Sequence, residues 1–165
     1  MNRVVIPLLT LALALGFVIC VFAQIVIVPG LIADEAVHDP LVAYFRMPFT
    51  VIGVLGIACF QVVLVSTAML LTKAWGDAIF SRRAFPWVDA VIGAVVVAAA
   101  MSFAVSAMQL TVPAYVDPEG MGSLGLMLAG GAGTALGVCA ALVLLVMRGL
   151  LRRAMLLQEE MAQVV

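Results

Sequence analysis

The stretch Gly125–Ala141, GLMLAGGAGTALGVCAA, contains no charged residue and places a small side chain at every fourth position. Residues four apart lie on one face of a helix, and a face of small residues lets another backbone approach closely. The apolar stretch before it carries a second row at the same spacing. The members of the two rows are Gly125, Ala129, Gly133, Gly137 and Ala141, and Ala90, Ala94, Ala98, Ser102 and Ser106. Together the rows predict a closely packed helical hairpin.

The composition of the whole chain is that of a membrane protein. Of its 165 residues, 66% are hydrophobic and 10% are charged, whereas ordinary soluble domains contain about 25% charged residues. This composition excludes a water-soluble globule. The net charge of −1 lacks the basic excess of nucleic-acid-binding proteins, so no direct binding of nucleic acid is expected.

Four apolar segments are long enough to cross a bilayer, since a hydrocarbon layer of about 30 Å needs about 20 helical residues. They cover approximately residues 4–28, 47–72, 88–112 and 121–147, and an amphipathic tail follows over residues 148–165. None shows the alternation of a membrane barrel strand. The sequence therefore predicts an all-α fold, an integral membrane four-helix bundle that forms one domain over residues 1–165.

The basic residues predict the orientation of this bundle. Of the eight Lys and Arg residues, all except Arg46 fall on one side of a four-span arrangement. Cytoplasmic loops carry the excess of Lys and Arg, so both termini and the loop between the second and third helices are expected in the cytoplasm.

The first segment has two interpretations. Its ending at Ala23 is compatible with a cleaved signal peptide, but the apolar run continues through Val28, longer than the core of about 7–15 residues in such peptides. We therefore favour a membrane span. Pro29 and Gly30 are expected to end this helix.

Among the polar side chains within the predicted spans, four are candidate intramembrane contacts. They are Gln61, Ser102, Ser106 and Thr134. Hydrogen bonds between membrane helices are the favoured interpretation of these residues. The alternative is a polar path through a small oligomeric transporter or pore. The spans carry no ionisable residue at mid-membrane depth, which argues against a proton relay or ion-coupled transport.

No catalytic, cofactor-binding or metal-binding constellation is present in the sequence. The three cysteines are dispersed, and no CxxC motif, phosphate-binding loop or Ser-His-Asp set occurs. Asp34 and His38 would share a face if their loop formed a helical turn, but one His with unspaced carboxylates is a weak ligand set. We therefore expect no enzyme activity, no cofactor and no bound metal.

Most of the charged residues lie on the expected cytoplasmic side. In the loop between the second and third segments, Phe80 is followed by Arg82 and Arg83, a mixture that suits an anionic lipid surface or a partner protein. The amphipathic tail ends with Glu159 and Glu160. These five residues are the candidate partner-binding surface.

Three motifs resemble those of the domain of unknown function 2975 family of small four-span bacterial membrane proteins. They are Pro29-Gly30, the loop Gly76-Asp77-Ala-Ile-Phe80-Ser81, and the tail Leu151-Arg152-Arg153-Ala154-Met155-Leu-Leu-Gln158-Glu159-Glu160. One departure is an extra residue between Gly76 and Phe80. The resemblance implies a multi-pass protein of the bacterial plasma (inner) membrane and, as a partner, a small cytoplasmic helix-turn-helix regulator.

The leading functional prediction is a non-enzymatic membrane protein that binds or sequesters such a cytoplasmic regulator. The alternatives are the small transporter or pore described above, and an accessory subunit of a larger membrane complex whose helices meet the small-residue rows. Besides the lipid bilayer, a second copy of the chain is a further possible partner, because the rows would also suit self-association.

Overall fold

The computed structural model describes the backbone of residues 5–75, 85–113 and 115–162, and the side chains of residues 7–72, 85–113 and 115–156. Within these ranges the chain forms helices and turns and contains no strand. The described residues include four helices long and apolar enough to cross a membrane, which are Pro7–His38, Arg46–Thr72, Phe85–Gln109 and Met121–Leu156. The predicted all-α class and the four membrane helices are therefore confirmed.

The first membrane helix is longer than the sequence predicts. Helix α1 (Val5–Phe22) continues through a π-helical turn (Ala23–Ile27) directly into α2 (Val28–His38), so the expectation that Pro29 and Gly30 end it is wrong. A proline inside a helix lacks an N–H, and its ring meets the carbonyl four residues earlier. The wider turn lies directly before Pro29, where the Val28 N–H donates to the Ala23 carbonyl five residues back. This local widening lets the helix pass the proline.

A short helix, α3 (Pro40–Tyr44), links α2 to the second membrane helix. The Asp39 carboxylate accepts a hydrogen bond of 2.8 Å from the Leu41 N–H and so caps the start of α3. Leu41 and Phe45 are buried against Val116 in the connection between the last two helices. This apolar cluster ties the first half of the chain to the second at one end of the molecule.

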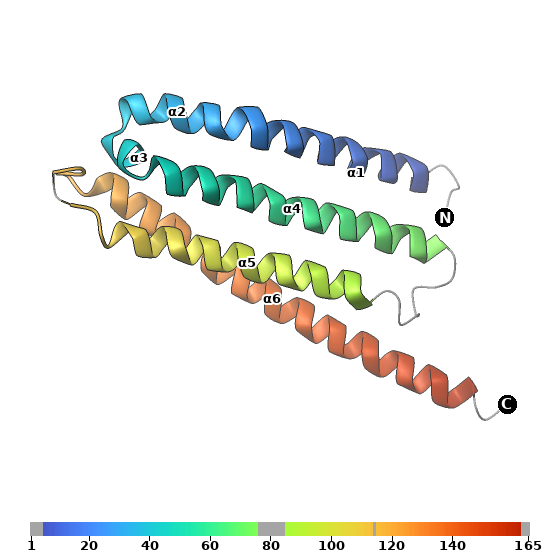
Figure 1. Cartoon of the computed structure of the whole chain (residues 1–165). Helices are drawn as coiled ribbons and strands as arrows, with labels where there is room; N and C mark the ends of the chain where they lie inside the picture. Colours follow the sequence, from blue (N-terminus) through green and yellow to red (C-terminus); the bar gives the residue numbers. More distant parts are fainter. Residues whose placement is uncertain (1–4, 76–84, 114, 163–165) are drawn as a thin grey trace.

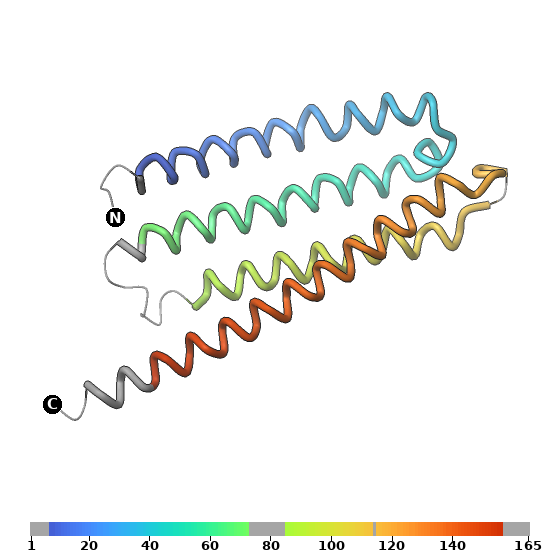
Figure 2. Tube along the Cα trace, turned by 180° about the vertical axis from the view of Figure 1, so that it is seen from behind, coloured from blue at the N-terminus to red at the C-terminus, as the bar shows by residue number. Residues whose placement is uncertain are grey.

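The remaining helices are α4 (Arg46–Trp75), α5 (Phe85–Gln109) and α6 (Met121–Ala162). Each long helix packs mainly on its neighbour in the sequence: α1 on α4, α4 on α5, and α5 on α6. Figures 1 and 2 show this order from opposite sides, with the first helix at one edge of the bundle and α6 at the other.

Helix α6 is the longest element, with 42 residues. At a rise of 1.5 Å per residue it is about 63 Å long, twice the thickness of a hydrocarbon layer of about 30 Å. Its last turns run past the start of α5, at the end of the molecule where α1 begins and α4 ends (Figure 1). The tail is therefore a direct extension of the fourth membrane helix.

Candidate functional site

The closest helix contact lies between α5 and α6, and glycines of α6 make it possible. A methyl group added at Gly137 would lie 2.6 Å from the Ala99 Cβ atom, and one at Gly130 would lie 2.7 Å from the Ser102 carbonyl oxygen. A methyl group at Gly133 would lie 3.0 Å from the Ser102 Oγ atom. At Gly130 and Gly137 only a hydrogen atom fits between the helices, and at Gly133 a methyl group would require the Ser102 side chain to shift.

The contact face of α6 follows a different line from the predicted row. Gly133 and Gly137 lie against α5, but a methyl group at Gly125 would meet no described atom within 4 Å, and Ala129 is exposed. Each four-residue step overshoots a full turn by about 40°, so a long row at this spacing winds around the helix. Gly130 and Gly137, seven residues apart, deviate by only about 20° and stay on the face.

The row predicted on α5 also lies only partly in the α5–α6 interface. Ser102 and Ser106 lie against the α6 glycines, and the Ser106 hydroxyl donates a hydrogen bond of 2.7 Å to the Met127 carbonyl oxygen across the interface. Ala90, in contrast, lines a pocket formed with α1 and α4. The hairpin is thus held by close backbone approach and by this serine hydroxyl.

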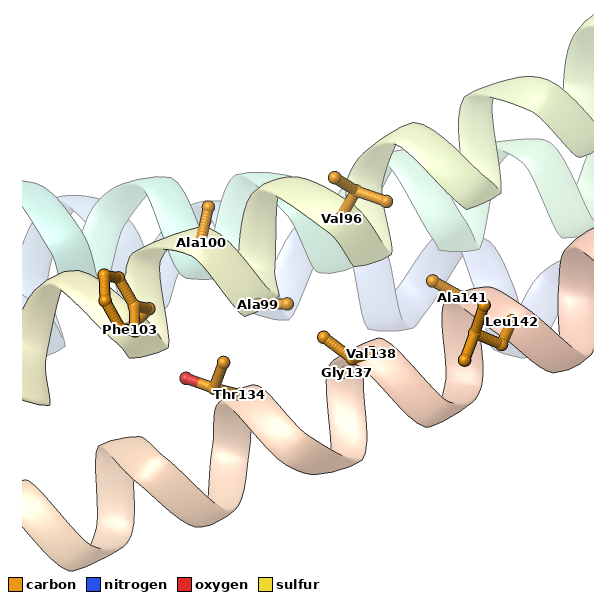
Figure 3. Close-up of a pocket in the computed structure, with 9 residues that line it drawn as sticks. All are labelled: Val96, Ala99, Ala100, Phe103, Thr134, Gly137, Val138, Ala141 and Leu142. Carbon is orange, nitrogen blue, oxygen red and sulfur yellow. The ribbon is translucent and has the colours of Figure 1, made fainter.

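A groove of about 370 Å³ lies between α5 and α6 (Figure 3). Its lining residues are Val96, Ala99, Ala100, Phe103, Thr134, Gly137, Val138, Ala141 and Leu142. Thr134 has the polar side chain in this set, and its hydroxyl donates to the Gly130 carbonyl oxygen of its own helix at 2.8 Å. The groove therefore offers an apolar surface and no free hydrogen-bond donor.

The second polar contact joins the first two membrane helices. Gln24, inside the π-helical turn, donates from Nε2 to the Gln61 Oε1 atom at 3.1 Å and to the Val54 carbonyl oxygen at 3.2 Å. The Nε2 atom of Gln61 is itself buried and has no hydrogen-bond partner in the described part of the chain. A buried donor left unpaired costs about 1–3 kcal/mol.

The structure separates the four predicted intramembrane positions into different contacts. Ser102 and Ser106 lie in the α5–α6 interface, and Thr134 bonds within its own helix. Gln61 contacts Gln24 instead of any of these three. Gln24 was missed as a partner because the expected helix end at Pro29 placed it near the outer boundary, whereas the helix continues well past it to His38. The sequence signal that could have indicated this contact is the presence of one glutamine in each of the first two spans.

An ion pair joins α5 and α6 beyond the glycine contact. Arg148 donates from Nη2 to the Asp89 Oδ2 atom at 2.9 Å, and its Nε atom lies beside Oδ1. Both side chains remain partly exposed, at 39% and 46%. Asp89 lies in the first turns of α5, so this pair holds α6 where its basic tail begins.

At the opposite end of the hairpin, Asp117 caps the start of α6. Its Oδ2 atom accepts a hydrogen bond of 2.7 Å from the Ser123 backbone N–H. This bond favours the carboxylate and is the main reason why the pKa of Asp117 lies below its ordinary value. Gly120, with a φ of 68°, supplies the left-handed turn that brings Asp117 back over the helix.

The candidate partner-binding residues fall outside the part of the chain that the structure describes. Phe80, Arg82 and Arg83 lie between residues 76 and 84, and the side chains of Glu159 and Glu160 lie beyond residue 156. His38, considered with Asp34 as a weak metal ligand, instead has its Nδ1 atom 3.1 Å from the Asp34 backbone carbonyl oxygen. This contact joins the His38 side chain to the backbone in the last turn of α2.

Comparison with known proteins identifies the family. The family described as protein of unknown function (DUF2975) matches residues 30–165, and the chain belongs to this family. The resemblance found in the sequence motifs is therefore confirmed. No curated protein and no solved structure matches the chain.

Proposed function

We propose that this member of the DUF2975 family is a non-enzymatic protein of the bacterial plasma (inner) membrane that binds a cytoplasmic protein. The observation that carries the proposal is the length of α6, which continues without a break from Met121 to Ala162. A helix of about 63 Å exceeds the membrane and holds its last turns in water. Such an extension suits the display of a binding surface.

The surface of the tail has the composition expected of a docking element. Arg152 and Arg153 are exposed, whereas Met155 is buried at 8% exposure. The helix therefore combines a basic side, suited to water or lipid headgroups, with apolar side chains, of which Leu150 and Leu156 are exposed at 55% and 51%. From Arg148 to Ala162 it extends by about 21 Å.

The Asp89–Arg148 ion pair supports the same proposal by fixing where the tail leaves the membrane helices. The tail lies at the end of the molecule where α4 ends and α5 begins (Figure 1). By the distribution of basic residues this end faces the cytoplasm. We propose that the loop with Phe80, Arg82 and Arg83 and the tail with Glu159 and Glu160 form one surface. The partner implied by the family resemblance is a small helix-turn-helix regulator.

The proposal is tested by photocrosslinking in native membranes from a photoreactive residue at position 81. Capture of one soluble protein, identified by mass spectrometry, is the expected result. The double changes Arg82→Ala with Arg83→Ala, and Glu159→Ala with Glu160→Ala, should abolish this capture. Arg46→Ala, which removes an arginine from the opposite end of α4, is the matched control and should leave capture intact. Recovery of lipid and self-crosslinks alone would exclude the proposed partner.

No observation on the described residues favours the alternative of a pore. A pore would need its polar side chains along one face, but Gln61 pairs with α1, Ser106 with α6, and Thr134 with its own helix. The Gln61 amide and the Ser106 and Thr134 hydroxyls therefore stabilise three separate contacts.

A further inference from the structure

A pocket of about 410 Å³ lies between α1, α4 and α5, apart from the α5–α6 groove. Its walls are mostly apolar and include Phe17, Ala58 and Ala90. Ligand pockets of about 300–1,000 Å³ are typically built in this way, with apolar walls and a few polar groups that orient the ligand. The volume and composition therefore suit an uncharged molecule dissolved in the membrane.

Two polar side chains belong to this pocket. Ser66 is 1% exposed, and Gln61 carries the buried Nε2 atom that has no hydrogen-bond partner among the described residues. In hydrocarbon an unpaired N–H is more costly than in water-filled regions. Gln61 thus has a donor to offer, and the matching ligand group is a hydrogen-bond acceptor.

Gln24 contacts the Gln61 side chain without using this donor. It donates to the Gln61 Oε1 atom and also to the Val54 carbonyl oxygen. The terminal torsion of glutamine is soft, so Gln61 can exchange its bond from Gln24 for one to a ligand in the pocket, while Gln24 keeps its bond to the Val54 carbonyl oxygen. The π-helical turn that carries Gln24 is a feature often found at functional sites.

The pocket opens sideways, towards lipid. Val62 and Val65 line it and are exposed on α4 at 42% and 40%. Trp87, near the start of α5, also lines it. A ligand would therefore enter from the bilayer and place its apolar part between the helices.

We infer that this pocket binds an uncharged, membrane-dissolved molecule whose carbonyl oxygen accepts a hydrogen bond from Gln61 Nε2. Two kinds of molecule present this chemistry, a ring dione such as a quinone and the acyl ester of a membrane lipid. This inference does not depend on the proposed cytoplasmic partner, because it concerns residues within the membrane.

The test uses Trp87 as the reporter in the full-length protein. The chain has two tryptophans, and Trp75→Phe leaves Trp87 alone. Decylubiquinone, whose ring quenches tryptophan fluorescence, is titrated into nanodiscs of ester-linked phospholipids and, separately, of ether-linked phospholipids that lack the ester carbonyls. Saturable quenching in both lipids would identify a ring dione as the ligand class. Saturation only in the ether lipids would show that the lipid ester itself competes for the pocket.

Two variants connect this quenching to the pocket. Gln61→Leu should weaken binding about two- to tenfold, the range of one neutral hydrogen bond. Ala90→Leu fills the pocket and should abolish saturation, whereas Ala100→Leu, the same change on the exposed face of α5, should not. Circular dichroism checks that each variant is folded. Quenching that rises linearly in both lipids, or that is unchanged by Gln61→Leu and Ala90→Leu, would overturn the inference.

Discussion

Gly137 determines how closely α5 and α6 approach, and its substitution gives a direct prediction. Gly137→Ala places a methyl group 2.6 Å from the Ala99 Cβ atom, so the helices must separate. We expect the free energy of unfolding to fall by about 1–3 kcal/mol, as for overpacked cores. The measurement is reversible unfolding in mixed micelles with sodium dodecyl sulfate.

Gly125→Ala is the matched control for this change. Its methyl group would meet no described atom within 4 Å, and alanine favours a helix over glycine by about 1 kcal/mol. We expect the same or slightly higher stability. Equal losses for the two variants would show that contact with α5 does not explain the effect of Gly137→Ala.

The Gln24–Gln61 hydrogen bond gives a second prediction at the scale of residues. In a double-mutant cycle with Gln24→Leu and Gln61→Leu, we expect a coupling free energy of about 0.6–2 kcal/mol, the range for polar contacts between membrane helices. Thr134→Val, which removes a bond within one helix, should have little effect. A coupling near zero would mean that the two amides do not stabilise the packing of α1 on α4.

Individual residues show what a sequence pattern can and cannot predict. Small residues at regular spacing correctly indicated a close hairpin. Two backbones can approach only where the side chains between them are small, and this holds for any path of small residues along the helix surface. The choice of line depends on the crossing of two helices, which the sequence does not contain. The row through Gly125 and Ala129 was therefore predicted, while Gly130, which lies against Ser102, was not.

At the scale of elements, the apolar length of each segment predicted the membrane helices well, because the membrane sets that length. The helix ends depended on local chemistry instead. Pro29 normally ends a helix, but the π-helical turn before it lets the chain continue to His38. The Gln24–Gln61 contact was missed for the same reason.

The cap of α6 gives a prediction for the pH dependence of stability. The pKa of Asp117 in the folded protein lies below the ordinary value of 3.8, chiefly because of the Ser123 N–H. Its contribution to stability is therefore fully present above that value and is lost as the pH falls through the folded pKa. Asp117→Asn keeps an acceptor but cannot titrate, so its unfolding curve should lose this acid-dependent step.

Glu119→Gln removes a carboxylate from the same connection and serves as the control for Asp117→Asn. It should keep the acid-dependent step of the unmodified protein. Unfolding followed by circular dichroism at pH values above and below 3.8 makes the comparison. The same acid dependence in Asp117→Asn as in the unmodified protein would assign the step to another group.

The orientation of the whole molecule is the prediction that the structure leaves to experiment. Seven of the eight basic residues lie on the side of the two termini, so this side should face the cytoplasm. Green fluorescent protein fused to the C-terminus should fluoresce, and alkaline phosphatase fused there should stay inactive. Phosphatase activity would place the tail outside and remove the basis for a cytoplasmic partner.

The packing of each long helix on its neighbour in the sequence also bears on how the protein is made. A helix that leaves the ribosome finds its main partner in the helix synthesised just before it, so assembly needs few contacts between distant parts of the chain. Chains with such local contacts fold quickly. We therefore expect the bundle to grow one helix at a time during insertion, with the α5–α6 hairpin closing last.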